Sequence, residues 1–217
     1  MNTFTATANN GSTIGRCKYG SNNWDLGYSN GARQGAYKGT SNSKSYVGVM
    51  VFQNAGKYLK GNTIKKITMQ FTCSAAGYAT NKTLTVRKAR YQYLAGVYGS
   101  SQVGDTLGTL YGLFYNRTLT FTLDQNTNAA LFNNLAAYFK EGNCTLSIYN
   151  GETSSSSGYS SNYLCINQCV LTVEYESGTV YYRKDGAWKR CSAYYRKNGQ
   201  WIKCIPYYRK NGEWKKG

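Results

Sequence analysis

The end of the chain, residues 180–217, is built from three tandem copies of one 13-residue unit. Each copy contains two tyrosines, an arginine, a lysine, an Asp-Gly or Asn-Gly pair, one variable residue and a tryptophan. The part that the copies share runs from Tyr181 to Trp188, from Tyr194 to Trp201 and from Tyr207 to Trp214, and it recurs every 13 residues. Asp-Gly and Asn-Gly between β-favouring residues are the strongest short-range signal for a hairpin, because both central positions of a type I′ turn need a positive φ. The repeat therefore predicts three β-hairpins in series.

The predicted turn fixes which residues of a hairpin face each other. With Asn198-Gly199 as the loop, the pairs are Lys197 with Gln200, Arg196 with Trp201, and Tyr195 with Ile202. Arg196 then lies beside the Trp201 ring, a contact worth about 0.5–1 kcal/mol when exposed. The same reasoning pairs Arg183 with Trp188 and Arg209 with Trp214. Because a lone hairpin is marginal in water, we expect the three to stack or meander and share a face.

Two interpretations of the repeat residues differ in what the rings do. Residues 180–217 hold 11 Lys+Arg against 2 Asp+Glu. In one interpretation, Tyr and Trp stack on sugars while the cations attract an anionic wall polymer or a partner protein. In the other, which we favour for the Trp residues, the rings form a small core, because so short a unit has nothing else to build one from. The Arg and Lys rows are then the first candidates for binding. The full set of candidate binding residues is Arg183, Arg196, Arg209, Trp188, Trp201, Trp214, Tyr182, Tyr195 and Tyr208.

Residues 1–176 alternate between apolar and polar positions in several short runs, which predicts β-strands. The run 46–52 is apolar throughout and suits a strand covered on both faces. The alternating runs are 67–73, 84–86, 118–123, 144–148 and 170–175. Residues 1–43 are rich in Gly, Asn, Ser and Thr, and we interpret them as an opening strand followed by long loops.

One helix is predicted from about Thr127 to Lys140. Phe132, Leu135, Ala136 and Phe139 form a single apolar stripe at helical spacing. Asp124 and Asn126 offer capping chemistry before the helix, and Gly142 suits its end. Many short strands with one short helix predict an all-β fold, a jelly roll or β-sandwich, over 1–176. The hairpin repeats form a second unit over 180–217, with the boundary near Glu176 to Thr179.

The order of these elements resembles that of the DNRLRE-type β-sandwich modules of surface proteins. The resemblance covers about 45–176, and the usual Trp of the helix is replaced by Tyr138 or Phe139. It implies a jelly-roll fold and a non-catalytic role. The matching segments are Val51-Phe52, Ile64 to Met69, Leu123-Asp124 with the helix after it, Gly142 before Cys144, and Leu171 to Tyr175.

Several kinds of chemistry find no support in the sequence. The chain has no His, which removes Ser-His-Asp and Cys-His catalysis and the commonest zinc ligand. Glu174 and Glu176 share a strand face, but a solvated strand explains them better than a glycosidase pair does. The spacing of Cys165, Cys169, Cys191 and Cys204 matches no zinc pattern, and we interpret the seven cysteines as mostly buried free thiols. Helix capping explains Asp124 better than a calcium loop does. We therefore predict no catalytic residue, metal or cofactor.

Charge and hydropathy restrict the partners. The net charge is +17, yet no nucleic-acid-binding pattern accompanies it and the charge outside the repeats is scattered, so we do not expect nucleic acid as the ligand. No run of 18 apolar residues predicts a membrane span, and the first residues lack the pattern of a secretory signal. A virion component, made in the host cytoplasm and released by lysis, reconciles the missing signal with a composition typical of glycan-facing β proteins.

The repeats also resemble the C-terminal repeats of minor structural and tail-associated proteins of phages of Gram-positive hosts. The resemblance covers 180–217 and implies a virion protein, tail-associated or fibre-like, that serves host-envelope adhesion or virion assembly. We expect a homo-oligomer whose partners are other virion proteins and a cell-wall glycan or anionic wall polymer. Two alternatives remain open: a capsid decoration protein without glycan binding, and a bacterial surface adhesin, against which the missing signal counts.

Overall fold

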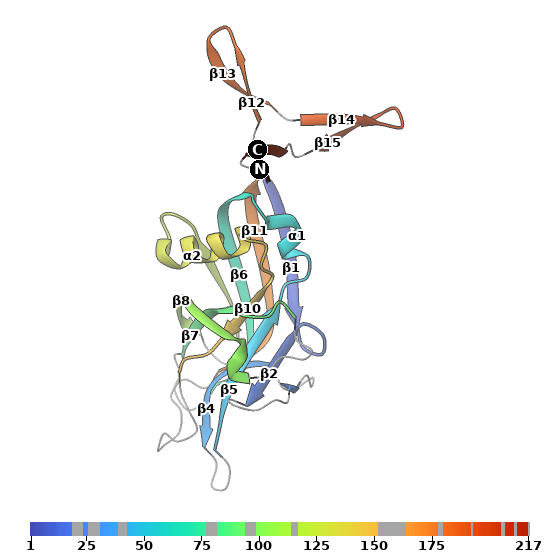
Figure 1. Ribbon diagram of the computed structural model, residues 1–217. Helices are drawn as coiled ribbons and strands as arrows, with labels where there is room; N and C mark the ends of the chain where they lie inside the picture. The colour runs from blue at the N-terminus through green and yellow to red at the C-terminus, as the bar shows by residue number, and fades with distance from the viewer. Residues whose placement is uncertain are drawn as a thin grey trace.

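The computed structural model describes most of the chain (Figure 1). The described residues are 1–18, 24–25, 31–38, 43–76, 82–93, 99–113, 117–151, 164–177, 180–191, 193–204, 207–210 and 212–216.

The first sheet consists of four antiparallel strands. Their order across the sheet is β1-β11-β6-β9, and β11 and β6 pair along almost their full length. Their outward positions are polar and their inward positions apolar, which confirms the predicted alternation at 67–73 and 170–175. The strands are β1 (Asn2–Asn9), β11 (Leu164–Glu176), β6 (Thr63–Ala76) and β9 (Arg117–Leu123).

The second sheet faces the first across the core. Its order is β8-β7-β10-β5, and β2 lies on the far side of β5 with the short β3 beside it. β4 pairs with β11 through its first residues and with β5 through its last ones, so it joins the two sheets along one side. The strands are β8 (Val103–Leu113), β7 (Lys82–Ala89), β10 (Thr145–Ile148), β5 (Ser43–Val51), β2 (Ile14–Lys18), β3 (Trp24–Asp25) and β4 (Ala32–Lys38).

The connections between the sheets are those of a jelly roll. If β2 to β4 are left out, eight strands remain: β1 is the first along the chain, and β5 to β11 are the second to the eighth. One sheet then has the strand order 1-8-3-6 (β1-β11-β6-β9), and the other has the order 2-7-4-5 (β5-β10-β7-β8). Each sheet thus alternates strands from the two ends of the segment, as in the paired Greek keys of a double-sheet jelly roll. The predicted all-β jelly-roll fold is confirmed.

The predicted helix is α2 (Ala129–Lys140), which packs against β6, β8 and β9 and covers the open side between the two sheets. Its end is as predicted: Gly142 has φ +100° and donates its N–H to the Phe139 carbonyl at 3.0 Å. Its start differs, because the Asp124 carboxylate accepts the N–H groups of Asn126 and Thr127 and so orders the preceding loop. A shorter helix, α1 (Ala55–Leu59), and a 3₁₀ turn, η1 (Gly99–Gln102), were not predicted.

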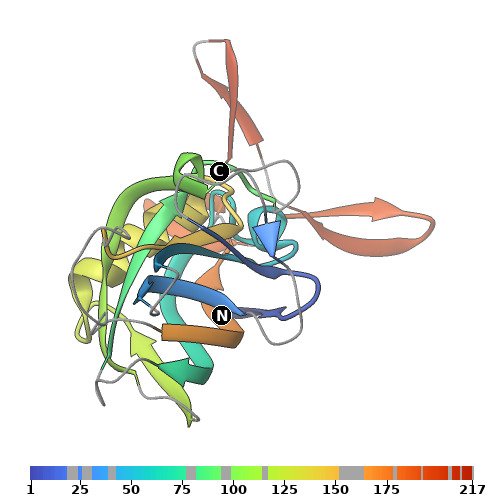
Figure 2. The ribbon, with the colours of Figure 1, turned by 90° about the horizontal axis from the view of Figure 1, so that it is seen from below.

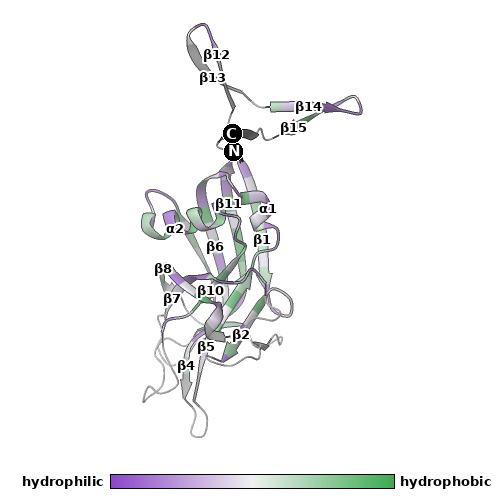
Figure 3. Ribbon diagram, viewed as in Figure 1, coloured by the Kyte–Doolittle hydropathy of each residue, from purple (hydrophilic) through white to green (hydrophobic). Residues whose placement is uncertain are grey.

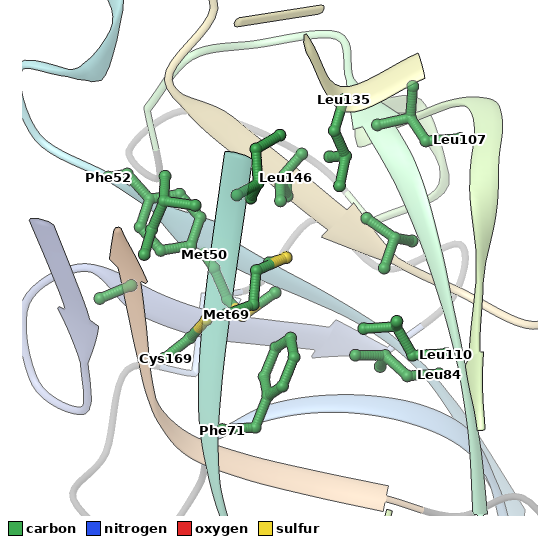
Figure 4. Close-up of a cluster of buried hydrophobic side chains, with 14 of the residues drawn as sticks. Met50, Phe52, Met69, Phe71, Leu84, Leu107, Leu110, Leu135, Leu146 and Cys169 are labelled. Atoms are coloured by element: carbon green, nitrogen blue, oxygen red, sulfur yellow. The ribbon is translucent and has the colours of Figure 1, made fainter. Parts of the chain in front are cut away.

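The core lies between the sheets and beneath α2 (Figure 4). Phe52, Phe71, Phe132 and Phe139 are its largest fully buried side chains. In Figure 3 the sandwich strands change between hydrophobic and hydrophilic residues along their length, as one-sided burial requires. The all-apolar run of β5 is buried on both faces, as predicted for 46–52.

The strand β10 differs from its prediction. We expected an exposed polar face over 144–148, but all four residues of β10 are buried. Ser147 Oγ donates to the Lys88 carbonyl at 2.8 Å, and the Thr145 N–H donates to Gln92 Oε1 at 3.0 Å. The polar face is therefore covered by a segment that is distant in sequence. The first 43 residues differ too: they contain β1 to β4 where we expected one strand and loops.

Beyond Glu176 the chain forms three hairpins, each a two-stranded sheet of its own among the described residues. The first two extend in different directions in both ribbon views (Figures 1 and 2), so these two hairpins do not form the expected shared face. The strands are β12 (Val180–Lys184) with β13 (Ala187–Cys191), β14 (Ala193–Lys197) with β15 (Gln200–Cys204), and β16 (Tyr207–Lys210) with β17 (Glu213–Lys216).

Candidate functional site: the hairpin repeats

The turns of the first two hairpins have the geometry that the sequence predicts. Asp185 and Gly186 have φ +54° and +78°, and Asn198 and Gly199 have φ +50° and +80°. Two consecutive positive φ values define the type I′ turn, whose twist matches that of the flanking strands. In the third hairpin Gly212 has φ +83°, and Asn211 lies outside the described residues.

The register is the same in all three repeats. Arg183 pairs with Trp188, Arg196 with Trp201, and Arg209 with Trp214. The other predicted pairs of the middle hairpin, Lys197 with Gln200 and Tyr195 with Ile202, are also confirmed. A directly opposed pair of residues points to one face of a hairpin. Each repeat thus places one arginine and one tryptophan at corresponding positions of its backbone.

The middle hairpin shows how such a pair is arranged. The guanidinium carbon of Arg196 lies 6.0 Å from the centroid of the Trp201 ring, at the edge of the range for a cation–π contact. Trp201 is 68% exposed, so the indole is open to solvent. The side chains of Arg183, Trp188, Arg209 and Trp214 lie outside the described part of the chain, as do those of Tyr182 and Tyr208.

The two tyrosines of the middle hairpin lie on opposite faces. Because side chains alternate along a strand, Tyr195 points away from the face that carries Arg196 and Trp201. Tyr194, which was not among the predicted binding residues, shares that face and is 53% exposed. Period-two alternation would have identified Tyr194 from the sequence, had it been applied to the choice between the paired tyrosines.

The expectation that the rings form a small core is wrong for the middle hairpin. Tyr195, on the opposite face, is 47% exposed, and Ile202 beside it is also exposed. The hairpin is a two-stranded sheet of its own, and the exposure of Tyr194, Tyr195 and Trp201 shows that neither of its faces is covered. The aromatic side chains are therefore available for contact, together with the cations.

Both carboxylates of β11 have ion-pair partners, and most of the described thiols are buried. Glu174 and Glu176 form ion pairs with Lys66 at 2.6 Å and Lys65 at 3.2 Å. Among the described residues no cluster of three potential metal ligands occurs. The free cysteines in the described part of the chain are Cys17, Cys73, Cys144, Cys165, Cys169 and Cys204, of which Cys17, Cys73, Cys165 and Cys169 are buried as predicted.

Burial also sets the protonation of the thiols. It raises the pKa of Cys17 and of Cys73 to about 12, and that of Cys169 well above its ordinary value. These thiols are protonated at neutral pH, and a protonated thiol is a poor nucleophile. Their role is packing.

No protein-family model matches the chain, and no curated protein sequence matches it. The helices of the described residues include none long and apolar enough to cross a membrane.

Proposed function

We propose that this chain is a non-catalytic virion structural protein, tail-associated or fibre-like, whose hairpin repeats attach it to an anionic polymer of the bacterial envelope. The observation that carries the proposal is the solvent-exposed Arg196–Trp201 pair, in a register that recurs in each repeat. The likeness of the repeats to those of tail-associated phage proteins supports the virion context.

The charge of the repeats favours an anionic partner. Residues 180–217 carry a net charge of +9, more than half of the total of +17 in about a sixth of the chain. Clustered cations attract a polyanion, and an exposed ring beside a guanidinium adds a flat surface for a sugar. Three similar sites in series also allow several weak contacts to act together on one polymer, which raises the overall avidity.

Binding to purified Gram-positive cell walls tests this proposal. Walls are compared before and after chemical removal of their anionic polymer, at low and high salt. We expect binding that falls with salt and is lost with the polymer. Replacing Arg183, Arg196 and Arg209 together by Gln should weaken binding at least about tenfold, because three charge contacts act in one chain.

Two further variants complete the experiment. Replacing Trp188, Trp201 and Trp214 by Ala separates ring stacking from charge. Tyr111→Ala removes an exposed aromatic residue of β8, away from the repeats, and should bind as the wild type does. Wild-type binding no greater than that of the arginine variant would exclude the proposal. Imaging of intact particles tests the virion context separately.

A further inference from the structure

The free edge of β1 carries backbone groups without partners. Asn9 donates its N–H to Thr13 Oγ1 at 2.9 Å and accepts the Thr13 N–H at 3.2 Å. The next residue, Asn10, instead directs its N–H to β11, where it donates to the Asn167 carbonyl at 3.1 Å. The N–H and C=O of one strand residue point to the same side, and successive residues alternate. The β1–β11 register has no shift, so Thr3, Thr5 and Thr7 direct their backbone groups away from β11, as Asn9 does.

Among the described residues, these six backbone groups have no protein partner. Within the described residues, β1 pairs only with β11, and no backbone hydrogen bond joins Thr3, Thr5 or Thr7 to α1 or to the residues before it. Exposed strand edges are normally protected by Lys, Pro, bulges or short length. β1 has eight residues, Asn-Thr-Phe-Thr-Ala-Thr-Ala-Asn, without a charge, a proline or a glycine.

A hollow of about 540 Å³ runs beside this edge. It is lined by residues 3–7 together with Gln53, Asn54, Tyr58 and Tyr175, none of which is charged. The Tyr58 ring stacks on Phe4 at 5.5 Å and remains 47% exposed. The Nζ of Lys57 lies 5.6 Å from the centroid of the same Tyr58 ring, while β1 itself and the lining residues carry no charge. In a chain with 26 Lys+Arg, an uncharged strand edge beside such a hollow marks a place where another strand can dock.

We propose that β1 is an oligomerisation strand, which pairs antiparallel with β1 of a second copy of this chain about a two-fold axis at Thr5. Thr5 then faces its own counterpart, and Thr3 faces Thr7 of the other copy. This register joins all three outward-directed residues in hydrogen-bonded pairs, and all twelve backbone groups of the two edges form six hydrogen bonds. If one strand is shifted by two residues along the other, in either direction, the outward-directed residues no longer all pair with one another. Some of their backbone groups are then left unpaired, or lie opposite Asn9, whose own N–H and C=O already bond to Thr13.

The side chains fit the same register. Thr meets Thr on the outer face of the sheet, where β-branched residues pack well across strands. On the inner face, Phe4 of one copy lies opposite Ala6 of the other. This pair lies next to the hollow that is lined by Tyr58 and Tyr175. The first sheet becomes one continuous sheet across the two copies. The pairing is independent of what the hairpins bind.

Charge variants of the full chain test the two-fold pairing directly. In Thr5→Lys and in Thr5→Glu, each copy meets an identical charge across the axis, so we expect either protein alone to be monomeric in sedimentation equilibrium. An equimolar mixture should form a heterodimer. Thr120→Lys places the same charge on β9, the other edge of the sheet, and should associate as the wild type does.

A backbone variant tests the hydrogen bonds. Thr5→Pro removes an N–H that points away from β11, so the β1–β11 ladder is kept, and Thr5→Val keeps the N–H and the branched shape. We expect Thr5→Pro to weaken dimerisation about 10- to 100-fold and Thr5→Val to change it little. Wild-type protein that stays monomeric up to its solubility limit would overturn the proposal. So would dimers that survive in both charge variants, which would place the interface elsewhere. If Thr5→Pro does not fold, the charge pair alone decides.

Discussion

Tyr138 is the most connected polar side chain of the described core. Its hydroxyl lies 2.7 Å from the Thr145 carbonyl and 3.1 Å from the Ala89 carbonyl, and it accepts the N–H of Ala89 at 3.1 Å. Gln92 Nε2 donates to the same oxygen at 3.1 Å. One hydroxyl on α2 thus satisfies backbone groups of β7 and β10 that water does not reach, since Tyr138 is buried.

We expect Tyr138→Phe to lower the free energy of unfolding by about 1–3 kcal/mol, because it keeps the ring but leaves buried backbone groups unpaired. Urea unfolding at neutral pH measures the change. Tyr111→Phe removes the hydroxyl of an exposed tyrosine and should have almost no effect. An equal, small change in both variants would show that the Tyr138 hydroxyl does not stabilise the fold.

The buried thiols predict a dependence of stability on pH. The pKa of Cys17 and of Cys73 is about 12 in the folded chain, because burial disfavours the thiolate, against an ordinary value of 9.0. A pKa raised by folding contributes stability that is complete below the unfolded value and is lost as the pH rises through the folded value. Stability should therefore fall between about pH 9 and pH 12.

The urea midpoint measured from pH 7 to pH 10.5 checks this expectation. Cys17→Ala with Cys73→Ala removes both thiols and should make the alkaline decline shallower, although the variant is less stable at pH 7. Parallel declines in wild type and variant would assign the loss to other groups.

At the residue level, the sequence predicted the backbone geometry of the hairpins but not the exposure of their side chains. The type I′ turn and the opposition of Arg196 and Trp201 follow from Asn198-Gly199 alone, because a two-residue loop fixes the register. The exposure of Trp201 could not be predicted in this way. It depends on whether the hairpins cover one another, which no local signal in the repeat determines.

At the level of elements, α2 and β8 are held close together by a glycine. A Cβ built on Gly108 would lie 2.9 Å from Leu131 Cδ1 and 3.1 Å from Leu131 Cβ, so the helix rests directly on the strand backbone. Leu131 is a buried residue of α2 and belongs to the same core cluster as Leu107 and Leu110 of β8.

We expect Gly108→Ala to destabilise the protein by about 1–3 kcal/mol through overpacking, which outweighs the gain of about 0.5–1 kcal/mol from removing a strand glycine. Urea unfolding gives the value. Thr106→Ala, at an exposed position of the same strand, is the matched control. A Gly108→Ala variant as stable as this control would mean that α2 moves aside freely.

The sequence predicted elements that bury one face of a regular segment, and it predicted β5 from an uninterrupted apolar run. The periodicity of α2 and of the central strands β6 and β11 is strong because each meets the core on one side only. The helix α1 has five residues and starts after Asn54 at φ +65°, so it is too short for a periodic pattern. β10 was placed correctly, but its burial depends on Gln92 and Lys88, which only the folded topology brings to it.

At the level of the whole molecule, the jelly roll is complete before the repeats begin. All eight of its strands and both helices end by Glu176, and the core contains no residue of the hairpins among those described. The hairpins add charge without adding to that core. Residues 180–217 carry +9 of the net charge of +17, so a chain that ends at Ser177 has a net charge of +8.

We therefore expect the chain truncated after Ser177 to fold cooperatively, with a free energy of unfolding within about 0.5 kcal/mol of that of the full protein. Ser177 is retained because its Oγ accepts a hydrogen bond from Asn2 Nδ2 at 3.2 Å. The separate 180–217 peptide should lack stable structure, because its hairpins have no covered face. Circular dichroism and urea unfolding of both pieces check this. A truncated chain that unfolds without cooperativity would show that the repeats, despite their separate sheets, stabilise the sandwich, and the boundary near residue 178 would then not separate two units.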